Sequence, residues 1–125
     1  MSTVVVPASN QWLIRVGVGT VTATTDPIAL DGADSATAIL NVHELFGGSS
    51  PAERSLRYHT QTSIDGVAWV DQGPSDSASD PGVPPPATGA VNGTLIRFVF
   101  LLELLPPATG VAGTCFDLHV RLRKS

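Results

Sequence analysis

Three histidines and one cysteine are the side chains of this sequence best suited to bind a metal ion or to move protons. His43, His59 and His119 fall in three separate segments, and no two of them have the local spacing of a metal-binding pair. None stands in a recognisable nucleophile motif with a serine, cysteine or carboxylate. Cys115 is expected to be a small, buried or half-buried side chain at the start of a strand.

The carboxylates gather in segments that read as loops. Asp76-Ser77-Ala78-Ser79-Asp80 has the acidic spacing that begins a calcium loop, but it lacks the further acidic ligand, the glycine and the closing glutamate of an EF-hand. Calcium held by scattered loop ligands stays an alternative. The sequence therefore predicts no catalytic residue, no metal site and no cofactor, and we expect that the protein is not an enzyme.

Composition excludes several classes of function. The chain has 125 residues, of which 42% are hydrophobic and 14% charged, with a formal net charge of -4. Nucleic-acid binding is not expected, because it needs a basic surface. A single cysteine cannot form an internal disulfide. The sequence contains no run of about 20 apolar residues that could span a membrane, and we expect no export by a signal peptide.

Segments of alternating apolar and polar residues predict the elements that would position any site. Because side chains alternate between the two faces of a strand, this pattern favours strands over helices. Ile64 is expected at the end of the buried face of the strand that begins at Ser55. The clearest strands are expected at 55–64, 94–104 and 116–123, and weaker ones at 11–18, 20–24, 35–45 and 67–71.

Short strands separated by glycine and proline predict an all-β fold, an antiparallel β-sandwich of the jelly-roll or immunoglobulin-like kind with about six to eight strands. We expect residues 1–10 to form an N-terminal arm or an edge strand. Residues 11–125 would then form one sandwich domain, interrupted by a long proline-rich loop at 72–93.

The most specific local pattern is Ser63-Ile64-Asp65-Gly66-Val67-Ala68-Trp69. Asp65-Gly66 between two strands predicts a tight hairpin turn, because glycine adopts positive φ without strain. Ser63, Asp65, Gly66 and Trp69 are therefore expected to build a structural hairpin, with Trp69 packed beneath it. Two further segments accompany the hairpin, Leu30-Asp31-Gly32-Ala33-Asp34-Ser35-Ala36-Thr37 before it and Leu95-Ile96-Arg97-Phe98-Val99 after it.

In these three segments the chain is similar to small β-sandwich virion proteins of tailed phages, and its hairpin resembles the Ser-x-Asp-Gly-x-x-Trp hairpin of discoidin-like domains. The likeness to phage proteins implies a structural virion protein, most specifically a capsid decoration (cement) protein that stabilises the shell by protein contacts. Its partners would be copies of itself, for instance in a trimer, and a major capsid or other virion protein. It would be assembled in the host cytoplasm and reside in the virion.

Two alternatives stay open. The discoidin-like hairpin implies a carbohydrate-binding module with a glycan as ligand, and a virion protein could equally belong to the tail or the head–tail connector. For assembly by contact, two segments are expected to form the interface, an apolar one near the N-terminus and a proline run within the long loop: Val4, Val5 and Val6, and Pro84, Pro85 and Pro86.

Overall fold

A computed structural model of the 125-residue chain describes residues 2–5 and 12–125, with side chains from residue 12 onward. The elements of the described part are strands and one turn of 3₁₀ helix, which lies at η1 (Pro51–Glu53). No helix in this part is long and apolar enough to cross a membrane. The strands are β1 (Ser2–Val5), β2 (Trp12–Val16), β3 (Gly19–Thr24), β4 (Ile28–Ala29), β5 (Ser35–Phe46), β6 (Arg54–Ser63), β7 (Val70–Asp71), β8 (Asp76–Ala78), β9 (Ala87–Ala90), β10 (Leu95–Leu104) and β11 (Val111–Arg123).

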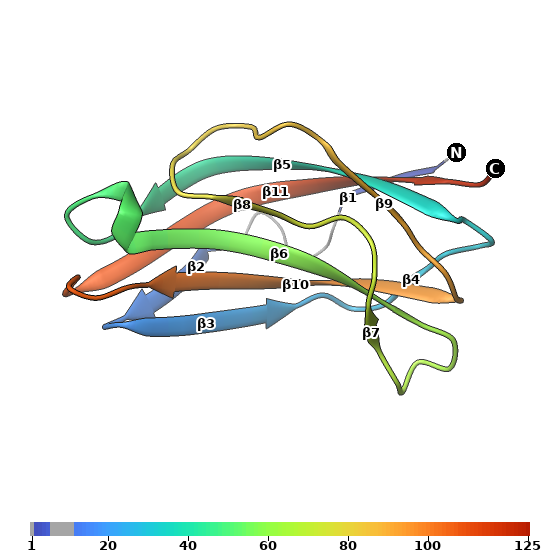
Figure 1. The fold of residues 1–125 in the computed structure, drawn as a ribbon, viewed down its shortest axis with the longest axis horizontal. Coiled ribbons are helices and arrows are strands. Elements are labelled where there is room, and N and C mark those ends of the chain that lie inside the picture. Colours follow the sequence, from blue (N-terminus) through green and yellow to red (C-terminus); the bar gives the residue numbers. More distant parts are fainter. Residues whose placement is uncertain (1, 6–11) are drawn as a thin grey trace.

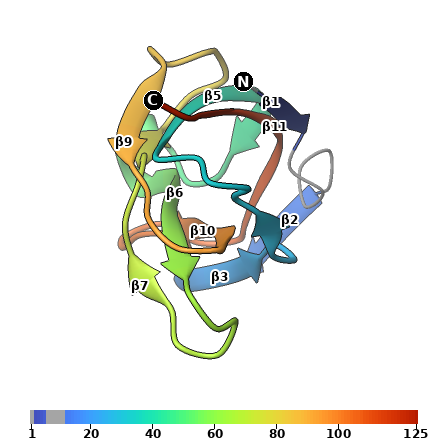
Figure 2. The same cartoon turned by 90° about the vertical axis from the view of Figure 1, so that its right-hand side faces the viewer.

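The strands form two antiparallel sheets that face each other (Figures 1 and 2). In the first sheet the order is β9, β5, β11, and the far side of β11 pairs with both β1 and β2. In the second sheet β10 lies between β3 and β6, while β4 extends the β3 side and β7 and β8 extend the β6 side. The predicted all-β antiparallel sandwich is confirmed, with more strands than expected because several are only two to four residues long.

The inner faces of the two sheets supply the core. Five alternate residues of β10 are fully buried, as the alternation predicts, and those of β6 and β11 follow the same rule. Aromatic rings fill the centre: Phe100 lies 4.7 Å from Phe116 across the sandwich and 6.3 Å from Tyr58 on the neighbouring strand, measured between ring centroids. The buried residues of β10 are Ile96, Phe98, Phe100, Leu102 and Leu104.

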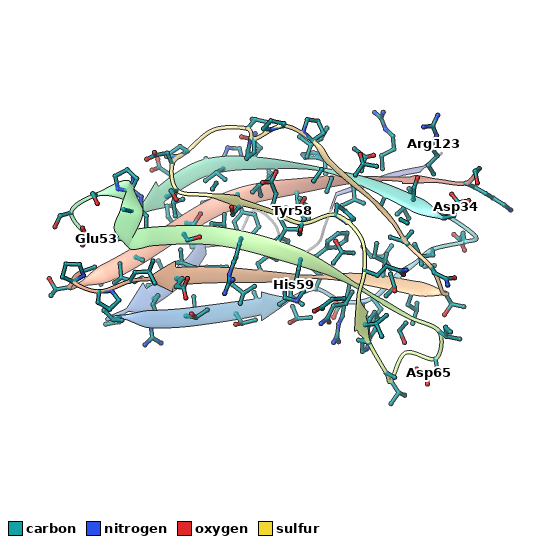
Figure 3. All side chains as sticks on the ribbon, in the orientation of Figure 1. Asp34, Glu53, Tyr58, His59, Asp65 and Arg123 are labelled. Carbon is teal, nitrogen blue, oxygen red and sulfur yellow. The ribbon has the colours of Figure 1, made fainter. Side chains whose placement is uncertain are left out.

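Tyr58 places a hydroxyl in this core without a hydrogen-bond partner among the described residues. Its side chain is 2% exposed and points between the layers (Figure 3). Burial, together with the carboxylate of Asp76, raises the pKa of the Tyr58 phenol well above its usual value. The hydroxyl therefore costs free energy on folding, because it gives up water and gains nothing in return.

Tyr58→Phe is expected to leave the free energy of unfolding unchanged or to raise it by up to about 1 kcal/mol, since only the unpaired oxygen is lost. The raised pKa adds a pH dependence. Above the usual tyrosine pKa of about 10 the unfolded chain loses the phenolic proton while the folded protein keeps it, so stability falls as pH rises. Denaturant titrations of both proteins at neutral and alkaline pH measure this. A clear loss of stability in Tyr58→Phe at neutral pH would contradict it.

The proline-rich segment 72–93 is more ordered than the sequence predicted. It contributes β8 to the edge of β6, forms an isolated bridge between Gly82 and Val42, and then adds β9 to the edge of β5. One stretch of chain thus passes from one sheet to the other and covers the open side between them (Figure 2). Its prolines lie between the paired stretches, where no ladder hydrogen bond is required of them.

Two expectations near the hairpin were wrong. Ile64, predicted on the buried face, is 78% exposed, because β6 ends at Ser63 and the chain turns away there. The strand predicted at 67–71 shrinks to β7, Val70–Asp71, since the residues before it belong to the turn.

Candidate functional site

An apolar face covers the outside of the first sheet at one end of the sandwich. Trp12, Ile14 and Val16 point outward from β2 and are 53%, 47% and 73% exposed. Val111 on β11 stands opposite Val16, and Phe46 at the end of β5 lies 6.3 Å from Trp12 between ring centroids. We call these five residues the apolar face; none of them carries a charge. Contiguous exposed apolar surface of this kind marks interaction sites in proteins.

Gly113 on β11 makes the apolar face flat. It stands between Ile14 on one side and Phe46 on the other in the strand register. A Cβ atom at this position would lie 2.6 Å from the Phe46 ring and 3.1 Å from Cδ1 of Ile14. Both side chains therefore lie across the bare backbone of Gly113, and a larger residue there would push them apart.

A β-bulge turns Phe46 to the outside. Val42 pairs with Phe116 and Glu44 with Cys115, so His43 is the extra residue on β5. Before the bulge the even-numbered residues of β5 are buried; after it Leu45 is buried and Phe46 is exposed. Bulges redirect side chains in this way at binding surfaces. Without this bulge, Phe46 would point into the core.

Sequence reasoning did not identify the apolar face. It predicted an interface at residues 4–6 and 84–86, and this stays a prediction. Val4 and Val5 lie in β1 and pair with Val120 and His119 of β11, so this part of the predicted arm is an edge strand. Val6 lies outside the described residues. The proline run, with Pro84 half-buried and Pro85 and Pro86 exposed, directly precedes β9. One sequence pattern could have indicated this face. Trp12, Ile14 and Val16 alternate with Leu13 and Arg15, so the first three share one side of the strand.

At the other end of the sandwich, the predicted hairpin is held by Asp65 (Figure 3). Its Oδ1 accepts hydrogen bonds from the backbone N–H of Ala68 (3.0 Å) and of Val67 (2.9 Å), and from the Ser63 hydroxyl (3.2 Å). These bonds, those from the Ala68 and Val67 amides first, hold the pKa of Asp65 below its usual value. Gly66 follows at φ 81°, in the left-handed region, and donates its N–H to the Ser63 Oγ (2.8 Å).

Trp69, directly before β7, packs on Arg97 at the outer face of the second sheet. The guanidinium carbon of Arg97 lies 4.1 Å from the centroid of its ring, a cation–π contact. Arg97 also donates to Gln61 Oε1 (2.8 Å), and Gln61 donates to Asp71 Oδ1 (3.1 Å). The expectation that Trp69 packs beneath the hairpin stays a prediction. Its contact with Arg97 shows that the ring lies against the outer face of the second sheet.

A pocket of about 290 Å³ opens beside this hairpin. Its walls come from the end of β6, the turn, β7 and the loop between β9 and β10. Five of its eight lining residues are polar and three are apolar. The lining residues are Thr62, Ser63, Ile64, Asp65, Ala68, Val70, Gln72 and Asn92.

The histidines do not come together. His43 Nε2 lies 2.7 Å from Asp117 Oδ2 on the first sheet, whereas His59 Nε2 lies 3.5 Å from Asp71 Oδ1 on the second. Within residues 12–125, no three His, Cys, Asp or Glu side chains are grouped closely enough to hold a metal ion.

Asp76 and Asp80, the two carboxylates of the segment compared with a calcium loop, also have different partners. Asp76 accepts a hydrogen bond from the N–H of Ser77 (2.8 Å), while Asp80 pairs with Arg54 (2.7 Å). The carboxylates are thus engaged separately, in a turn and in an ion pair.

Comparison with known proteins adds no family. No protein-family model matches the chain, and no curated protein matches its sequence. Among solved structures, the crystal structure of FLHE is similar over 99% of this chain and 97% of that chain, with 15% sequence identity and a TM-score of 0.39. A match at that level supports neither a fold assignment nor a function. The likeness of three segments to phage virion proteins therefore stays a prediction.

Proposed function

We propose that this chain is a non-catalytic structural protein that binds another protein surface through its apolar face. In its most specific form, the proposal is that the chain is a capsid decoration protein of a tailed phage, bound to the major capsid protein and to copies of itself. A tail or head–tail connector protein would use the same face. The observation that supports the proposal is the exposure of Trp12, Ile14, Val16, Phe46 and Val111 side by side on a flat sheet surface.

The physics of this face fits binding by contact area. Each square ångström of apolar surface removed from water contributes roughly 25 cal/mol, and aromatic residues are the commonest energetic centres of protein interfaces. Trp12 and Phe46 lie close together and are each about half exposed, so a partner can still cover much of both rings. Because the face is uncharged and the chain carries a net charge of -4, attraction over long distances contributes little. Binding should therefore survive high salt.

Trp12→Thr and Phe46→Thr test the proposal, since threonine keeps the preference for a strand and removes the aromatic ring. Each variant is expected to weaken assembly by about 30-fold or more, the loss typical of a central interface residue. The measurements are the oligomer mass by analytical ultracentrifugation and co-sedimentation with capsid shells, in low and high salt. Val67→Thr is the matched control, because Val67 is an exposed apolar residue at the opposite end of the sandwich.

Circular dichroism and thermal unfolding check that each variant is folded. Two results would contradict the proposal: Trp12 and Phe46 variants that assemble like the parent, or a parent complex that moderate salt dissociates. The genomic neighbourhood is a separate test, because genes for portal, major capsid or tail proteins beside this one are expected only for a virion protein.

A further inference from the structure

Asn92 lies on the loop between β9 and β10, where its side chain is exposed. The next residue is Gly93, whose backbone N–H has no hydrogen-bond partner among the described residues. The Cγ carbon of an asparagine and the backbone nitrogen of the next residue can close a five-membered ring, and two reacting groups held so close behave as if highly concentrated. Asn92 and Gly93 thus bring a carboxamide and a free nitrogen together at a place that water reaches.

The fold requires glycine at position 93. Gly93 has a φ of 118°, in the region that favours glycine, and a Cβ atom there would lie 2.7 Å from the carbonyl oxygen of Ser63. The amide of Thr94 donates to that same oxygen (2.9 Å), so this close approach is part of the link between β6 and β10. Because glycine has no side chain, nothing at position 93 obstructs ring closure. The connection that leads into β10 therefore keeps the reactive pair in the chain.

Asn41, the other asparagine of the described residues, does not have this freedom. It lies within β5, and the nitrogen that follows it, that of Val42, donates to the carbonyl of Gly82 (2.8 Å). A nitrogen held in this bond cannot turn toward the asparagine side chain, and the branched side chain of Val42 restricts rotation further. Asn41 is therefore an internal reference for an unreactive asparagine.

Two Asp-Gly pairs have a similar backbone but a less reactive side chain. Asp31 and Asp65 are both followed by glycine. An aspartate carboxylate is negatively charged at neutral pH, so it is attacked by a nitrogen less readily than the neutral carboxamide of asparagine. The nitrogen of Gly66 is also occupied, because it donates to Ser63 Oγ (2.8 Å). Asn92 is thus the most reactive of these four positions.

We propose that Asn92 is a site of spontaneous deamidation. The Gly93 nitrogen gives up its proton to the solvent and attacks Cγ of Asn92; a C–N bond forms, the bond from Cγ to Nδ2 breaks, and ammonia leaves with a proton from water. Water then opens the resulting succinimide at either carbonyl, which leaves aspartate or isoaspartate at position 92. One water is consumed, one ammonia is released and no oxidation state changes. The reaction goes beyond the proposed function and does not depend on it.

The reaction changes the charge of the loop and, in one product, its length. Either product adds a carboxylate to the pocket that Asp65 already lines, so two like charges lie there. Isoaspartate also lengthens the main chain by one carbon. The loop is held by the bond that the Val91 amide donates before it and by the bond that the Thr94 amide donates after it. With two residues between these bonds, the extra length has to weaken one of them.

The test is to incubate the folded protein at neutral and at mildly alkaline pH, and to follow each asparagine by peptide mapping and mass spectrometry. Asn92 is expected to gain about one dalton, with both products present, while Asn41 keeps its mass. The rate should rise about tenfold for each pH unit, because the attacking nitrogen must first lose its proton. The rate in the folded protein is expected to lie within about tenfold of the rate in guanidinium chloride, because the fold leaves the Gly93 nitrogen free.

Asn92→Gln is expected to react at least about tenfold more slowly, since its longer side chain would have to close a six-membered ring. Asn41→Gln is the matched control, and its position 92 should react like that of the parent. Circular dichroism checks that both variants are folded. In the isoaspartate form, hydrogen exchange should show lost protection at the amide of Val91 or Thr94.

The proposal is overturned if Asn92 keeps its mass in the folded protein while the unfolded chain reacts, or if Asn41 reacts as fast as Asn92. A rate that does not depend on pH, or an undiminished rate in Asn92→Gln, would also overturn it. Full protection of both amides in the isoaspartate form would contradict the expected effect on the loop. Trp12→Thr should lose assembly and deamidate at the parental rate, so the two proposals are tested separately.

Discussion

Replacing Phe100 by alanine is expected to lower the free energy of unfolding by about 3–5 kcal/mol. The Phe100 side chain is fully buried on β10, the central strand of the second sheet, and its ring contacts Phe116 of the opposite sheet. Truncation removes the ring that joins the two layers and leaves a cavity that a rigid sandwich fills poorly. Since domains are stable by only about 5–15 kcal/mol, this single change would remove a large part of the total.

Urea unfolding followed by circular dichroism measures this loss. Val67→Ala is the control, because Val67 is 84% exposed on the hairpin and its truncation should change stability by less than about 0.5 kcal/mol. A loss below about 1.5 kcal/mol in Phe100→Ala would mean that the two layers do not share a tightly packed core at this point.

Gly89→Ala is expected to lower the free energy of unfolding by about 1–3 kcal/mol, through steric overlap alone. A Cβ atom on Gly89 would lie 2.6 Å from the carbonyl carbon of Gly73 and 2.8 Å from the nitrogen of Pro74. Both are backbone atoms, so no side chain can rotate away. Either β9 must leave the edge of β5, or the segment at Gly73 must leave β6.

Thr88→Ala is the control on the same strand, since it removes an exposed hydroxyl bonded to Thr37 (2.9 Å) and a methyl group but adds no atom. Hydrogen exchange of the amides of Ala87–Ala90 locates the damage, because these residues should lose protection in Gly89→Ala before the rest of the sheet does. If Gly89→Ala had the stability and the hydrogen-exchange protection of the parent, segment 72–93 would not lie across the open side between the two sheets as described.

Sequence reasoning was strongest where structure depends on neighbouring residues. Alternation with period two identified β6, β10 and β11 and the buried face of each, because a strand turns successive side chains to opposite sides whatever surrounds it. The Asp65-Gly66 turn was predicted for the same reason: the Asp-Gly pair that favours a turn consists of neighbouring residues, and Gly66 adopts positive φ there.

What the tertiary structure decided involves residues far apart in the chain. The bulge at His43 exists only in the pairing of β5 with β11, so Phe46 reads as an inward residue until that register is known. The flatness of the apolar face needs Gly113 placed between Ile14 and Phe46, and segment 72–93 becomes ordered only because two sheet edges are available to it. The sequence alone determined the three central strands β6, β10 and β11 and which side of each is buried. Which outward residues meet to form a surface was decided by register, because pairing between distant strands depends on the packing of the whole sandwich.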